Sequence, residues 1–213
     1  MLRRTVILLV ALTVVGAGIA YAATLNVASA HLWAGSQTLT KSSCTLSPAT
    51  TDTFVNEAST SQTNGSATTL DVLGDTPSRK YSYVQFDLSG CAIPTTGGAD
   101  SATLSLFMTN APKGSLTLSA SRVTSAWSNS TTWSSQPTTA AATDSVSSGT
   151  TGNVLVTFTV TSDVDDFIKG VSSNLGWRIS ESGSFQGATK DLVQFSSSNA
   201  ASNKPQLVVN YEK

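Results

Sequence analysis

The sequence predicts an all-β protein, an antiparallel β-sandwich of jelly-roll-like type with one short helix. Apolar and polar residues alternate in several short segments, which is the pattern of strands with one buried face. Ser-, Thr- and Gly-rich turns separate these segments, and a single segment has the spacing of an amphipathic helix. Charged residues make up only 12% of the chain, about half the usual share, so hydroxyl and amide groups must supply much of the polar surface.

The N-terminus predicts export. Arg3 and Arg4 precede an uncharged apolar run over residues 5–19, and the small residues Ala20 and Ala22 form a cleavage pattern. The alternative is an uncleaved membrane anchor, but the run is shorter than the roughly 20 apolar residues that a spanning helix needs. We therefore expect a signal peptide over residues 1–22, a leader segment over 23–48, one sandwich domain over 49–213, and no stable membrane insertion.

The first half of the sandwich domain contains five expected strands. An Asn64-Gly65 turn precedes the second of them. In the third, Tyr81, Tyr83 and Gln85 share one face, because successive side chains of a strand point to opposite sides. The expected strands are 53–55, 67–72, 80–88, 102–108 and 116–123.

The second half continues with four strands and the helix. Residues 162–169 are the expected helix, since Asp163, Asp165 and Asp166 favour its first turns and Gly170 ends it. The expected strands are 153–160, 177–180, 192–196 and 206–211. About nine short strands with one helix indicate a sandwich rather than a parallel-sheet fold.

Two tryptophans, Trp127 and Trp133, lie six residues apart in a Ser- and Thr-rich segment over residues 122–137. This segment has few helix formers and ends at Pro137, which predicts a loop. The tryptophans either close the end of the sandwich as buried side chains or present ring faces on which sugar rings stack. Both interpretations stay open at the level of sequence.

The two cysteines, Cys44 and Cys91, predict a disulfide bond, because an exported chain with an even number of cysteines usually pairs them. A zinc site is the alternative. Two thiolates with His31 as the single histidine fall short of the four ligands that structural zinc requires.

Composition and charge argue against several functions. Loss of Arg3 and Arg4 with the signal peptide leaves ten basic residues against thirteen acidic ones, which is the wrong balance for nucleic-acid binding. The single histidine, His31, lies in the leader, so a Ser-His-Asp triad built on the sandwich lacks its base. We therefore expect no enzyme.

Acidic residues leave two weaker possibilities. The cluster of Asp163, Asp165 and Asp166 could supply the paired carboxylates of a glycosidase, but helix N-terminal charge explains it more simply. Calcium is a possible cofactor, with Asp52, Asn56 and Asp71 as weak ligand candidates. Calcium needs six to eight oxygen ligands, and no spaced binding loop is visible.

Seven segments in order resemble the DNRLRE-type domain, which is grouped with family-96 carbohydrate-binding modules of secreted bacterial proteins. The segments are DTFVNEASTSQTNGSATTLDV, SYVQFDLSG, SATLSLFM, RVTSAWSNSTTWSSQP, VTSDVDDFIKG, NLGWRISES and KPQLVVNYE. The resemblance spans about residues 51–213. It implies an extracellular jelly-roll sandwich, with polysaccharide binding known for some members.

Three positions depart from the family pattern. Gln85 stands where members often carry a basic residue, Ser196 to Asn199 stand where they often have a Ser-Arg-Glu-like stretch, and Thr159 stands where they often have Asp. If basic groups bind acidic polysaccharide in the relatives, a neutral glycan, or no glycan, is the better expectation for this chain.

These observations predict a secreted or cell-surface module that binds extracellular polysaccharide without catalysis. The candidate binding residues are Tyr81, Tyr83, Gln85, Trp127 and Trp133. The alternative is a structural subunit of a coat or fibre that self-associates through its leader, whose apolar residues an isolated tail would expose. These leader residues could equally add an edge strand to the same sandwich, because their periodicity is weak. A third, weaker possibility is a hydrolase that uses the aspartates.

Overall fold

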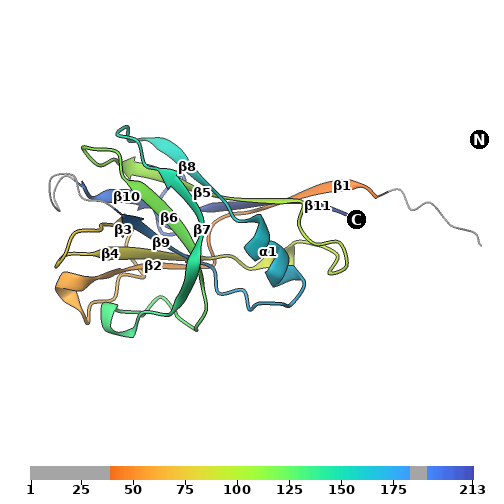
Figure 1. The fold of residues 1–213 in the computed structure, drawn as a ribbon, viewed down its shortest axis with the longest axis horizontal. Coiled ribbons are helices and arrows are strands. Elements are labelled where there is room, and N and C mark those ends of the chain that lie inside the picture. The colour runs from red at the N-terminus through yellow and green to blue at the C-terminus, as the bar shows by residue number, and fades with distance from the viewer. Residues whose placement is uncertain (1–38, 183–190) are drawn as a thin grey trace, which may run out of the picture. The chain divides into compact units, whose positions relative to one another are not determined.

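The computed structural model describes residues 39–182 and 191–213. Within these ranges eleven strands form two antiparallel β-sheets, with one short α-helix at one end of them (Figure 1). The predicted all-β sandwich with one helix is confirmed. The predicted signal peptide and the leader as far as residue 38 lie outside the described residues.

Sheet A has six strands. Five follow the order β1, β11, β5, β10 and β3, and β8 pairs along the opposite edge of β5. The strands are β1 (Lys41–Leu46), β3 (Thr69–Val72), β5 (Ser101–Asn110), β8 (Val154–Thr159), β10 (Val193–Ser196) and β11 (Gln206–Glu212).

Sheet B has five strands, in the order β2, β4, β9, β6 and β7. These are β2 (Thr51–Asn56), β4 (Lys80–Gln85), β6 (Thr117–Val123), β7 (Thr139–Ser147) and β9 (Trp177–Ser182). The helical elements are α1 (Thr161–Ile168) and the 3₁₀ turns η1 (Glu57–Ser59), η2 (Leu88–Gly90) and η3 (Trp133–Ser135).

The core lies between the two sheets and is built from the inward-facing residues of alternating strands. Trp177 is its largest fully buried side chain. The indole Nε1 of Trp177 donates a hydrogen bond of 2.8 Å to Asp163 in the first turn of α1, and its ring lies 5.6 Å from that of Phe167. The helix therefore closes one end of the core, and Asp163 has a structural partner there.

Two strands were not predicted, β1 and β7. Both are edge strands, and both consist mainly of Ser, Thr and Ala with most side chains wholly or partly exposed. An edge strand that buries little apolar surface has no clear hydrophobic alternation. Lys41 pairs with Glu212 of β11, so residues 41–46 of the expected leader segment add an edge strand to sheet A.

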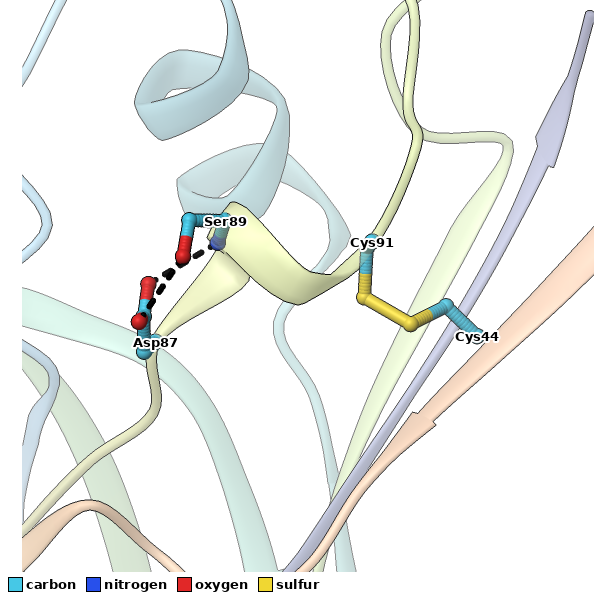
Figure 2. The surroundings of a disulfide bond; sticks show 4 residues. All are labelled: Cys44, Asp87, Ser89 and Cys91. Carbon is cyan, nitrogen blue, oxygen red and sulfur yellow. Dashed lines mark hydrogen bonds between the residues drawn. A yellow bond between two sulfur atoms is a disulfide. The ribbon is translucent and has the colours of Figure 1, made fainter.

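The predicted disulfide between Cys44 and Cys91 is present (Figure 2). Cys44 lies in β1, and Cys91 follows η2 directly. The bond ties the edge strand of sheet A to the chain that leaves β4 of sheet B.

Candidate functional site

The outer face of sheet B carries an aromatic cluster formed by Tyr81, Tyr83, Trp127 and Trp133. Tyr81 and Tyr83 share one face of β4, as predicted, and pack in a cluster separate from the core that holds Val84 of the same strand. The ring centroids of Tyr81 and Trp133 are 5.2 Å apart, and those of Tyr83 and Trp127 are 5.5 Å apart. Both distances are typical of favourable aromatic pairs.

The loop over residues 124–138, which connects β6 to β7, brings the two tryptophans to this face. Trp127 Nε1 donates to the carbonyl oxygen of Leu175 at 2.7 Å. The backbone N–H of Ser134 donates to the carbonyl oxygen of Thr60 at 3.2 Å. Gly65 lies so close to this loop that a Cβ there would fall 2.4 Å from the carbonyl oxygen of Asn129. Glycine at position 65 therefore permits the contact between the two loops.

The four rings differ in exposure. Tyr83 is 0% exposed, and its hydroxyl donates to Oε1 of Gln136 at 3.2 Å. Burial raises the pKa of Tyr83 above its ordinary value. Tyr81, Trp127 and Trp133 are half-buried. Neither earlier interpretation of the tryptophans is complete: they cover a small second core, and they still present ring surface to the outside.

Two arginines that the sequence reasoning did not select lie over these rings. The guanidinium of Arg178 is 4.9 Å from the centroid of Tyr81, and that of Arg79 is 5.3 Å from the centroid of Trp133. Both distances allow cation–π attraction. Arg79 also pairs with Glu57, with Nε 2.9 Å from Oε2, whereas Nε of Arg178 is buried without a partner. Arg178 could be found only from the pairing of β4 with β9, which places it opposite Tyr83.

Gln85, the remaining candidate, ends β4 two residues after Tyr83. Its Nε2 donates to the carbonyl oxygen of Asn174 at 2.8 Å, and it borders a shallow hollow at the end of sheet B. Of the five predicted binding residues, four form the aromatic cluster, and Gln85 bonds to Asn174, the residue before the Leu175 that accepts from Trp127.

The weak calcium candidates do not come together. Asp52 accepts hydrogen bonds from the N–H and the hydroxyl of Ser198, both 2.6 Å, and Asn56 caps η1. Asp71 accepts from Nζ of Lys80 at 2.7 Å and from Nε2 of Gln194 at 2.9 Å. Among the described residues, no group of three or more His, Cys, Asp or Glu is arranged to hold a metal ion.

Two facing antiparallel sheets, one of them with an aromatic cluster on its outer face, form a β-sandwich module. The chain belongs to carbohydrate-binding module family 96, whose model matches residues 43–211. The comparison with curated proteins finds no match. Over the ranges that the structure describes, no helix has the length and apolar character needed to cross a membrane.

Proposed function

We propose that the protein is an exported, non-catalytic module that binds extracellular polysaccharide on the outer face of sheet B. The observation that carries this proposal is the half-exposed pair Tyr81 and Trp133, flanked by the guanidinium groups of Arg79 and Arg178. Membership of a carbohydrate-binding family supports the ligand class. The predicted signal peptide supports export.

The pair combines the two kinds of contact that a sugar ring needs. The C–H groups of a sugar pack on aromatic carbon, and the sugar hydroxyls accept hydrogen bonds from guanidinium N–H groups. Beside the pair, Ser180, Ser119 and Ser145 form one row across β9, β6 and β7. This row adds neutral hydroxyl groups next to the aromatic surface, which suits a chain of sugars longer than the ring pair alone.

Affinity electrophoresis on a panel of soluble neutral and acidic polysaccharides tests the proposal. We expect at least one polysaccharide to retard the protein, and Trp133→Ala to remove most of that retardation. Phe107→Ala is the matched control, because Phe107 is a half-buried aromatic residue on the outer face of sheet A. Equal retardation of the Trp133 variant and wild type would mean that the binding site does not include Trp133. No retardation by any polysaccharide in the panel would contradict the proposed function.

A second candidate is self-association through the edge of sheet A. Strand β1 pairs on one side with β11, and within the described residues no strand pairs with its other side. An open edge of this kind can accept a strand from another chain. Deletion of residues 23–38 tests the leader while leaving β1 intact, and sedimentation velocity measures the assembly state. A polymer that persists after the deletion contradicts a role for the leader, and a monomeric wild type contradicts self-association itself.

A further inference from the structure

A groove lies where the chain leaves β4, at the end of sheet B, between η2 and α1. We call it the η2 groove. It consists of two neighbouring hollows of about 330 and 350 Å³ that share Asp87 and Asn174. Their walls include Thr50, Gln85, Asp87, Leu88, Ile168 and Asn174.

Asn174, in the wall of the groove, carries an unsatisfied hydrogen-bond acceptor. Its Nδ2 donates to the carbonyl oxygen of Phe86 at 2.8 Å, which sets the orientation of the amide. Its Oδ1 is then buried and has no hydrogen-bond partner. A buried polar atom without a partner is costly, so a turn of the Asn174 amide that brings Oδ1 to a bound hydroxyl donor recovers that free energy.

Asp87 supplies a second acceptor. One carboxylate oxygen accepts from the backbone N–H of Ser89 and the other from its hydroxyl, both at 2.8 Å (Figure 2). These hydrogen bonds hold the pKa of Asp87 below its usual range. No Lys or Arg among the described residues forms an ion pair with Asp87, and each oxygen keeps further acceptor capacity.

The opposite wall is apolar. Leu88, Ile93 and Ile168 are half-buried and line the larger part of the first hollow together with Phe167. An apolar wall facing convergent acceptors is the usual lining of a small-ligand site. The groove is also held in place, because the disulfide ties Cys91, directly after η2, to β1 (Figure 2).

We propose that the η2 groove binds a neutral sugar residue, which makes it a second contact site for the polysaccharide. The proposal rests on the proposed function. One sugar hydroxyl donates to Asp87, a second donates to Oδ1 of Asn174 once the amide turns toward the groove, and the C–H face packs against Leu88 and Ile168. A uronate or sulfate would meet the unpaired negative charge of Asp87, and an apolar ligand would leave both acceptors without donors. The chemistry of the groove therefore selects a neutral, hydroxyl-rich group.

A pair of neighbouring threonines allows a matched test. Thr95 lines the groove and Thr96 does not, and both are exposed. Thr95→Trp fills the groove with an indole, whereas Thr96→Trp places the same group beside it. With the neutral polysaccharide that retards wild type most, we expect at least a fivefold loss of affinity for Thr95→Trp and less than twofold for Thr96→Trp. Equal affinities of the two variants would overturn the proposal.

Asp87→Asn tests the charge selection. Asn keeps an oxygen that can cap η2, so the local fold is retained. We expect weaker binding of the neutral polysaccharide, because a charge-assisted hydrogen bond becomes a neutral one. We also expect the ratio of neutral to polygalacturonate affinity to fall. An unchanged ratio contradicts the role of Asp87.

The outcomes separate the groove from the proposed function. If Trp133→Ala loses binding while Thr95→Trp and Asp87→Asn behave as wild type, the groove is not a sugar site and the function on sheet B stands. If no polysaccharide binds wild type, both proposals fail. A direct readout is the NMR signal of the Asn174 side-chain amide, which should shift on addition of neutral oligosaccharide to wild type and stay constant in Thr95→Trp.

Discussion

The outer faces of the two sheets share one feature and differ in another. Both are rich in hydroxyl groups: Thr103, Thr157 and Thr159 lie on sheet A, and Thr117, Ser119, Ser145 and Ser180 lie on sheet B. Among the described residues, only sheet B is covered by a loop that adds aromatic side chains, whereas sheet A has Phe107 beside the exposed Leu155. Hydroxyl groups follow from the low charge of the whole chain and do not mark a site. The aromatic cluster is the feature that distinguishes sheet B, and we propose it as the binding site.

The largest expected difference between the faces is in stability. Tyr83→Ala should lower the free energy of unfolding by about 3–5 kcal/mol, because it empties the fully buried centre of the second core. Phe107→Ala should cost about 1–2 kcal/mol, because Phe107 is only half-buried on sheet A. Urea unfolding followed by circular dichroism measures both. Equal losses of unfolding free energy in the two variants would mean that the aromatic cluster contributes no more to stability than Phe107 on the outer face of sheet A.

The next effect concerns the edge of sheet A. Cys44→Ser combined with Cys91→Ser should lower stability by about 3–4 kcal/mol, since the bond closes a loop with a sequence separation of 47 residues. We expect the fluorescence of Trp127 and Trp133 in the native state to stay unchanged, because the cluster lies on the other sheet. A changed native spectrum would show that the disulfide also supports the face of sheet B. Unchanged stability would contradict its structural role.

A smaller effect, on the pH dependence of stability, is expected from the contrast between two buried carboxyl groups, one on each sheet. Asp71 of sheet A has hydrogen-bond donors in Lys80 and Gln194, whereas Glu181 of sheet B keeps Oε2 buried without a partner. Burial first, and then the charges of Asp191 and Asp75, raise the pKa of Glu181 to about 7, although the N–H of Gly74 partly offsets the shift.

Because the folded state holds the proton of Glu181 more tightly than the unfolded chain does, stability is greatest when the group is protonated. It should fall as the pH rises from about 4.5 through 7, by about 1–2 kcal/mol after allowance for solvent screening. Glu181→Gln should flatten this part of the profile, as measured by urea unfolding between pH 5 and 8. The same slope in wild type and variant would rule out Glu181 as its source.

The smallest effect is expected at the hydroxyl groups that the faces share. Ser119→Ala on sheet B removes a hydrogen bond of 2.8 Å to Ser145, and Thr157→Ala on sheet A removes an exposed hydroxyl. Both should change stability by less than about 0.5 kcal/mol, because exposed groups bond to water equally well. In the electrophoresis experiment, Ser119→Ala should weaken retardation slightly and Thr157→Ala should not. Equal retardation of the two variants would limit the binding face to the aromatic side chains.

Local pattern was enough to predict most of the fold. Alternation placed Tyr81 and Tyr83 on one face of a strand and predicted nine of the eleven strands in the described residues, and the even cysteine count predicted the disulfide. These features depend on neighbours in sequence or on a rule of pairing. The edge strands β1 and β7 were missed because they bury too little apolar surface to show a period.

The candidate sites depend on contacts between residues that are far apart in the sequence. Trp127 and Trp133 were identifiable as unusual loop residues, but their packing on Tyr83 and Tyr81 required the loop over residues 124–138 to fold back across sheet B. Arg178 reaches Tyr81 through the register of β4 with β9. Asp87 and Asn174 meet in the η2 groove although 87 positions separate them. Sequence periodicity determines which side of a strand a residue takes, and only tertiary packing decides which distant side chains share that side.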